Sequence, residues 1–167
     1  ELQSHEQLVC RLLLEKKTFV VPGISSSIAV PASQGISLTK RGVSESFWVI
    51  TGTTSARKLS ADVALAAQST ATVVILMGMS KLEEIVALFQ KESKGEMPVA
   101  IIQNGTTVHE KIGVGTINTI QSVVTENNLS SPAIIVIGEV VRDSKKRVGF
   151  YKELESNHNT VLVYGKE

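Results

Sequence analysis

The sequence predicts an α/β layer fold in which at least some strands pair in parallel. Short runs rich in Val, Ile and Thr alternate along the chain with segments of helical character, and this alternation is typical of α/β proteins. The short runs are apolar almost without interruption, as expected for strands that are covered on both faces. Six runs are strand candidates: residues 18–21, 46–50, 72–76, 99–102, 133–137 and 160–164.

Two apolar stripes between these runs predict amphipathic helices. The spacing i, i+3, i+4 of one helical face occurs across residues 82–89 and again across residues 117–124. Ser80 and Glu83 form the pattern of a capping box at the start of the first stripe. Thr116 is the expected N-cap of the second helix.

Further segments complete the expected helical layer. The three serines at 25–27 are suited to cap a helix, and Pro31 would then kink or end that helix. The Ala-rich residues 61–69 also predict a helix. Residues 142–159 are charged and polar, and they predict an exposed loop before a last edge strand.

Length and composition exclude several classes of function. With 167 residues, the chain has the size of one domain and can bury a real core. A net charge of +1 and an aromatic content of 4% argue against nucleic acid or an anionic membrane as a partner. No apolar run approaches the ~20 residues of a membrane-spanning helix. The single cysteine, Cys10, excludes an internal disulfide and a cluster of thiolate metal ligands.

The start of the chain carries neither an initiator Met nor the pattern of a signal peptide. We therefore expect this chain to be a piece of a longer protein, or a processed one. A single cysteine fits a reducing compartment, and we expect a cytoplasmic protein.

Most of the expected strands run into small or polar residues. In open α/β sheets, ligands bind outside the carboxyl ends of the strands, where glycine lets the backbone approach a ligand and Ser or Thr supply neutral hydrogen-bonding groups. The pattern therefore favours a ligand that is held by backbone and hydroxyl groups. The segments are 22–27 (Pro-Gly-Ile-Ser-Ser-Ser), 51–54 (Thr-Gly-Thr-Thr), 77–80 (Met-Gly-Met-Ser), 103–107 (Gln-Asn-Gly-Thr-Thr) and 138–139 (Gly-Glu).

Each of these segments also has a purely structural interpretation. Small residues after strands are common because βα turns need them. Asn104-Gly105 is a standard pair for a hairpin turn, and a Met after a strand, such as Met77, is commonly core filler. Taken one at a time, these interpretations outweigh the ligand interpretation.

Signatures of established catalytic chemistry are absent from the sequence. The three histidines, His5, His109 and His158, are widely spaced and have no ligand-like neighbours, so we expect no metal site. The Gly113-Val-Gly115 segment begins like a dinucleotide fingerprint but lacks its last glycine and its acidic residue. We name no catalytic residue.

Taken together and in order, the strand-end segments resemble the tetrapyrrole C-methyltransferase family, and within it the uroporphyrinogen members. The resemblance covers about residues 6–141. Its motifs are Val-Val-Pro-Gly-Ile-Ser-Ser from residue 20, Gly-Ile-Ser-Leu-Thr-Lys-Arg-Gly from 35, Val-Ile-Thr-Gly from 49, Met-Gly from 77, Met-Pro-Val-Ala-Ile-Ile-Gln-Asn-Gly-Thr from 97 and Ser-Pro-Ala-Ile-Ile-Val-Ile-Gly-Glu-Val-Val from 131.

The resemblance implies an open mixed sheet of about five strands flanked by helices. Family members have two α/β domains with the active site in the cleft between them, and act as homodimers. Residues 1–167 would form a single α/β domain, the C-terminal half of such a protein, and the N-terminal domain is absent from this chain. The fragment alone is then expected to be inactive.

The resemblance also implies a methyl donor, S-adenosylmethionine, with S-adenosylhomocysteine as its product and no metal. The donor-binding positions would be Ser25, Ser26, Met77, Ala100, Gly105 and Thr106. Thr39 and Arg41 would meet carboxylates of a tetrapyrrole substrate, although Lys40 replaces the His usual between them.

The implied function is methylation of a pyrrole ring carbon in sirohaem or corrinoid synthesis. Two alternatives remain open at this point. One is another methyltransferase of the same fold that acts on a later corrin precursor or on a different acceptor. The other is a non-catalytic binding or dimerisation domain.

Overall fold

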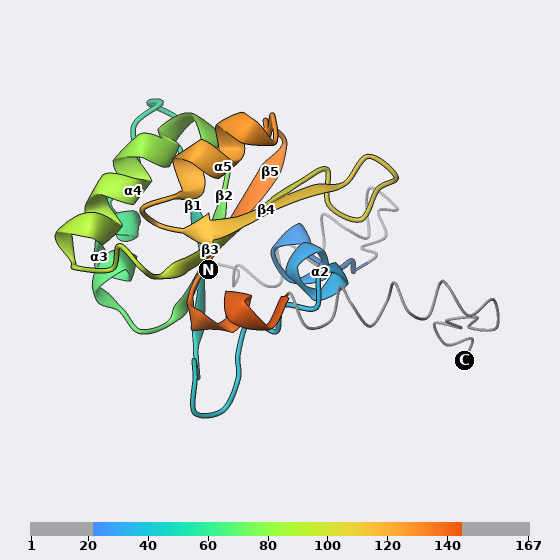
Figure 1. The fold of residues 1–167 in the computed structure, drawn as a ribbon, viewed down its shortest axis with the longest axis horizontal. Helices are drawn as coiled ribbons and strands as arrows, with labels where there is room; N and C mark the ends of the chain where they lie inside the picture. The colour runs from blue at the N-terminus through green and yellow to red at the C-terminus, as the bar shows by residue number, and fades with distance from the viewer. Residues whose placement is uncertain (1–21, 145–167) are drawn as a thin grey trace, which may run out of the picture.

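The computed structural model describes residues 22–144, which form a mixed α/β domain (Figure 1). Its strands, in chain order, are β1 (Phe47–Thr51), β2 (Thr72–Leu76), β3 (Pro98–Gln103), β4 (Lys111–Thr116) and β5 (Ala133–Ile137). Its α-helices are α2 (Ser26–Ser33), α3 (Asp62–Gln68), α4 (Leu82–Lys91) and α5 (Ile120–Glu126). Two 3-10 helices, η1 (Met79–Lys81) and η2 (Glu139–Asp143), follow β2 and β5.

The five strands form one sheet in the order β1-β2-β5-β3-β4. β1 and β2 pair in parallel, whereas β5 is antiparallel to both β2 and β3, and β4 is antiparallel to β3. The strands β1, β2 and β3 therefore point the same way, and their carboxyl ends meet at one edge of the sheet. The predicted open mixed sheet of about five strands is confirmed.

The core lies in two layers, one on each face of the sheet. On one face, alternate strand residues such as Ile75, Ile101 and Ile135 pack against α3, α4 and α5. On the other face, Val74 and Val136 pack against α2, the segment after it, and η2. Because both faces are covered, β2 and β5 are apolar at every position except Thr72, whose N–H and hydroxyl donate to the Ser44 hydroxyl.

Four of the six predicted strands are confirmed. Residues 46–50, 72–76, 99–102 and 133–137 correspond to β1, β2, β3 and β5 to within one residue. The two remaining candidates, 18–21 and 160–164, lie outside the described residues.

The strand β4 was not predicted, because the glycines at 113 and 115 interrupt the pattern of apolar residues that is typical of a strand. A Cβ on Gly113 would stand 2.6 Å from Leu129 Cδ1 and 2.8 Å from Val123 Cγ1. A Cβ on Gly115 would stand 2.8 Å from Thr119 Oγ1. The glycines therefore let α5 and the residues after it lie close on the strand, and the resemblance of this segment to a nucleotide fingerprint is incidental.

Two predicted helix starts are wrong, although the helices themselves are confirmed. The capping box does not form, since η1 occupies the expected cap and α4 begins at Leu82 without a side-chain cap. Thr116 is the last residue of β4, and α5 begins after Thr119, whose hydroxyl accepts the N–H of Thr116 at 2.9 Å. In both places a tight turn intervenes between strand and helix.

The helix α2 begins as the serine run predicts. Ser25 is its N-cap, and the Ser25 hydroxyl accepts the N–H of Ser27 at 3.3 Å. Pro31 lies within the helix, which ends two residues later at Ser33. This short helix covers the sheet next to the edge where β1, β2 and β3 end.

Candidate functional site

A cavity of about 450 Å³ opens at the carboxyl edge of the sheet, between β2 and β3. The start of β5 forms its floor, because β5 runs antiparallel between these two strands. Its walls contain no charged side chain among the residues that line it. They are Ser26, Val30, Leu76, Met77, Ile102, Asn104, Gly105, Thr107, Pro132, Ala133 and Ile134. We call it the edge cavity.

One lip of the edge cavity is Met77, directly after β2. Its backbone is left-handed, with φ 53°, and 64% of the residue is exposed. A left-handed backbone is unfavourable for a residue with a Cβ and marks a place that its surroundings hold in shape. Thr53, after β1, supplies one such restraint, because its hydroxyl donates to the Met77 carbonyl at 2.7 Å.

The opposite lip is the loop between β3 and β4. Asn104 and Thr106 are both left-handed, with φ 49° and 67°. Between them, Gly105 approaches α2 so closely that a Cβ would stand 2.3 Å from Val30 Cγ1. The Asn104 N–H also donates to the Pro132 carbonyl at 3.1 Å, which ties this lip to the floor of the cavity.

A carboxylate outside the edge cavity fastens this loop to α2. One oxygen of Glu110 accepts the Thr106 N–H at 2.6 Å and the Ser33 hydroxyl at 3.4 Å. Its other oxygen accepts from the side-chain amide of Gln34. An ionised carboxylate accepts several such bonds, so Glu110 joins the loop to the end of the helix.

The structure brings three of the predicted donor-binding residues into one cavity. Ser26, Met77 and Gly105 line it from three different elements. Ser25 lies next to it as the cap of α2, and Thr106 follows Gly105 on the lip, with its hydroxyl donating to the Gly105 carbonyl at 2.6 Å. Ala100 does not line the cavity, because it is fully buried in the core beneath.

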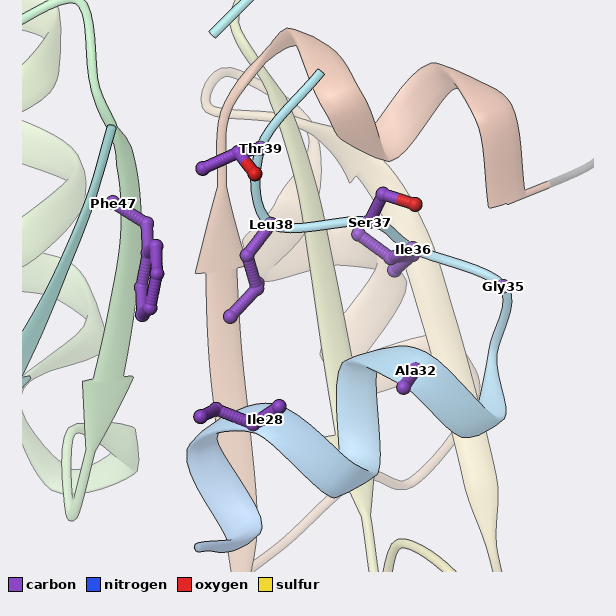
Figure 2. Close-up of a pocket in the computed structure, with 8 residues that line it drawn as sticks. All are labelled: Ile28, Ala32, Gly35, Ile36, Ser37, Leu38, Thr39 and Phe47. Atoms are coloured by element: carbon purple, nitrogen blue, oxygen red, sulfur yellow. The ribbon is translucent and has the colours of Figure 1, made fainter. Parts of the chain in front are cut away.

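Neither of the two predicted substrate residues lines the edge cavity. Thr39 lines a groove of about 430 Å³, formed by α2, residues 35–39 and Phe47. Figure 2 shows the Leu38 side chain directed toward Ile28 of α2, with Phe47 across the groove. Arg41 is exposed on the following turn and lines neither this groove nor the edge cavity.

A second hollow, of about 720 Å³, adjoins the edge cavity and shares Met77, Pro132 and Ala133 with it. Its other lining residues come from the end of β1 and the segment after it, from η1 after β2, and from the turn before β5, and most carry hydroxyls. They are Thr51, Thr53, Thr54, Ser55, Met79, Ser80 and Ser131. Met77 thus stands between two hollows of the same edge.

Neither Thr53 nor Glu110 was predicted as a site residue from the sequence. Thr53 belongs to a noted strand-end segment, so that segment was the available signal. Glu110 had no signal, because its partners at the end of α2, Ser33 and Gln34, lie 77 and 76 positions away in the sequence.

The titratable groups with shifted pKa values lie away from the edge cavity. Burial lowers the pKa of Lys94, which donates to the Ser69 carbonyl. A side-chain hydrogen bond to Glu139 raises the pKa of Arg142. Within residues 22–144, no three His, Cys, Asp or Glu side chains gather as they would around a metal ion. No helix in that same range is long and apolar enough to cross a membrane.

A mixed sheet with an uncharged cavity at the carboxyl ends of its strands defines a small-molecule-binding α/β domain. Over residues 4–121, the sequence matches the family described as Tetrapyrrole (Corrin/Porphyrin) Methylases. The uroporphyrinogen-III C-methyltransferase of Methanocaldococcus jannaschii is 45% identical over 125 residues, covering 73% of this chain and 51% of that protein. This chain belongs to the tetrapyrrole methylase family.

Two solved structures share the fold. A cobalamin biosynthetic enzyme, cobalt precorrin-4 methyltransferase, superposes with a TM-score of 0.68 at 19% identity, covering 81% of this chain and 58% of that one. The uroporphyrin-III C-methyltransferase of Thermus thermophilus, complexed with S-adenosylhomocysteine, has a TM-score of 0.63 at 23% identity, covering 84% and 62%. This chain spans about half the length of the curated relatives it matches.

Proposed function

We propose that the protein carrying this chain is an S-adenosylmethionine-dependent C-methyltransferase that converts uroporphyrinogen III to precorrin-2 in sirohaem or cobalamin synthesis. Residues 1–167 would be one α/β domain, the C-terminal half of a two-domain protein. That protein would act in the cytoplasm as a homodimer. The similarity to uroporphyrinogen-III C-methyltransferases supports the reaction, and the edge cavity supports the donor-binding role of this half.

The edge cavity carries the proposal, because its walls suit the adenosyl part of S-adenosylmethionine. Leu76, Ile102 and Ile134 offer apolar surface for a flat ring. The two left-handed lips and Gly105 bring main-chain groups close to the opening, and backbone N–H and C=O groups pair well with the polar edge of a heteroaromatic ring.

Ser26, Met77 and Gly105 would hold the donor directly, and Ser25 and Thr106 would shape the cavity beside them. Ala100 would affect donor binding only indirectly, by packing in the core beneath the start of β5. When bound, the donor supplies an electrophilic methyl group on its sulfonium. The residues of this chain would orient it and exclude water. Thr39 and Arg41 would meet substrate carboxylates, with the Arg41 guanidinium matching their geometry.

The test uses the full-length gene product with uroporphyrinogen III and S-adenosylmethionine, and the tetrapyrrole product is weighed by mass spectrometry. A gain of two methyl groups is the expected result. Binding of S-adenosylhomocysteine is titrated in parallel by calorimetry. Donor binding without methylation would mean that the acceptor is a different molecule. No donor binding would refute the proposal and favour a binding or dimerisation domain.

A further inference from the structure

The side chain of Thr53 touches the edge cavity only through Met77. Thr53 follows β1 and lines the second hollow, not the edge cavity. Its hydroxyl donates to the Met77 carbonyl at 2.7 Å, across 24 positions of sequence. A backbone pairing with Leu59 holds Thr53 in place.

The backbone of Met77 needs such a restraint. Its φ of 53° lies in a region that L-residues with a side chain seldom adopt. The flanking carbonyls are also bonded, since that of Leu76 accepts the Gly52 N–H at 2.7 Å and that of Gly78 accepts the Lys81 N–H at 2.9 Å. The Thr53 bond completes this series of three carbonyls and sets the peptide plane after Met77.

The segments that follow β1 and β2 are also packed closely against each other. A Cβ on Gly52 would stand 2.8 Å from the Gly78 Cα. The two loops are therefore in contact through their backbones, on both sides of Met77. A hydroxyl on one loop that bonds a carbonyl on the other fixes their relative position.

We propose that Thr53 is a positioning residue, which holds the left-handed Met77 lip in the shape that the methyl donor binds. The inference rests on the proposed function for the identity of the donor. The hydroxyl of Thr53, which lies outside the cavity, would keep the Met77 lip in place before the donor binds. Such preorganisation raises affinity because the ordering is complete before binding.

The test compares Thr53→Val, which keeps the shape and removes the hydroxyl, with Thr53→Ser, which keeps the hydroxyl. Both are made in the full-length protein. Thr125→Val is the matched control, because the Thr125 hydroxyl likewise donates to a main-chain carbonyl, that of Gln121 at 3.0 Å, but on α5. Binding of S-adenosylhomocysteine and hydrogen exchange at residues 76–80 are measured for each.

We expect Thr53→Val to weaken S-adenosylhomocysteine binding by about three- to tenfold, the size expected for one hydrogen bond. Its KM for the donor should rise by a similar factor with little change in kcat, and exchange at residues 76–80 should accelerate. The affinity of Thr53→Ser for S-adenosylhomocysteine should stay within about twofold of the parent's. The affinity of Thr125→Val should equal the parent's. A general loss of folded protein would instead lower kcat and leave KM unchanged.

Two outcomes would overturn the proposal. One is unchanged exchange at residues 76–80 in Thr53→Val. The other is accelerated exchange with unchanged donor affinity, since the lip would then not set the binding shape. Failure of the parent itself to bind S-adenosylhomocysteine would contradict the proposed function and the donor role together, while the exchange measurement would still decide whether Thr53 holds Met77.

Discussion

Replacement of Gly105 by Ala tests the close contact between the β3–β4 loop and α2. The added Cβ would stand 2.3 Å from Cγ1 of Val30, 2.6 Å from its Cγ2 and 3.0 Å from its Cβ. Carbon atoms in contact normally stand about 3.5–4.0 Å apart, so the loop and the helix must separate by about 1 Å. Glu110 joins the two elements, so their separation also stretches these hydrogen bonds.

The expected loss of stability is about 1–3 kcal/mol, the usual range for overpacking. We also expect S-adenosylhomocysteine to bind about tenfold more weakly, equivalent to about 1.4 kcal/mol, because the displaced loop is a wall of the edge cavity. Urea unfolding followed by circular dichroism and calorimetric titration measure the two effects. For the loss of stability, Gly23→Ala is the matched control, since a Cβ there meets nothing within 4 Å.

A second substitution, at Val30, tests the same contact from the side of α2. Val30→Ala removes both Cγ atoms and alone should cost about 1.6 kcal/mol for two methyl groups, plus a cavity contribution. In the double variant, the two closest contacts of the new Cβ at position 105 are gone, and only the Cβ of residue 30 remains, at 3.0 Å. The double loss should therefore be about 1–2 kcal/mol smaller than the sum of the single losses. Strict additivity, or a Gly105→Ala protein as stable as its parent, would refute the close contact.

Three further predictions concern other parts of the domain. Glu110→Ala should lower stability by about 0.5–1.5 kcal/mol, because the loop and the end of α2 lose their shared acceptor while water can reach the exposed donors, and it should weaken donor binding; Glu126→Ala is the control, and equal effects on both would contradict the prediction. Burial lowers the pKa of Lys94 below its ordinary value of 10.5, so the folded state binds fewer protons than the unfolded state between the lowered pKa and 10.5. The free energy of unfolding should therefore rise with pH across that interval. Urea unfolding at several pH values should show the rise in the parent and not in Lys94→Met. Gly52→Ala should destabilise the domain more than Gly105→Ala, because its Cβ would meet the backbone of Gly78 at 2.8 Å; the order of their urea midpoints checks this.

The central strands could be predicted from the sequence because their environment is uniform. β2 and β5 have neighbours on both edges and helices or turns on both faces, so every position except Thr72 is apolar. β4 has no such signal, since it is an edge strand and its packing against α5 requires glycine at 113 and 115. A requirement for the absence of a side chain cannot be recognised without knowing what fills the space.

The edge cavity was predictable only in part, for a related reason. Strand-end patterns and family resemblance directed attention to Ser26, Met77 and Gly105, which do line one cavity. The same patterns could not separate them from Ala100, which is buried beneath. Small residues serve both close packing and ligand approach, and the pattern does not record which of the two applies.

The shape of the edge cavity depends on residues that do not line it. Three ordinary residues, Met77, Asn104 and Thr106, hold left-handed backbones around its opening, and each such residue costs about 1–3 kcal/mol. Contacts from outside offset part of this strain, chiefly the hydroxyl of Thr53 and the carboxylate of Glu110. A homologue that keeps every lining residue but lacks these two groups should therefore bind the donor more weakly. Identity of the lining alone is an incomplete criterion for donor binding in this fold.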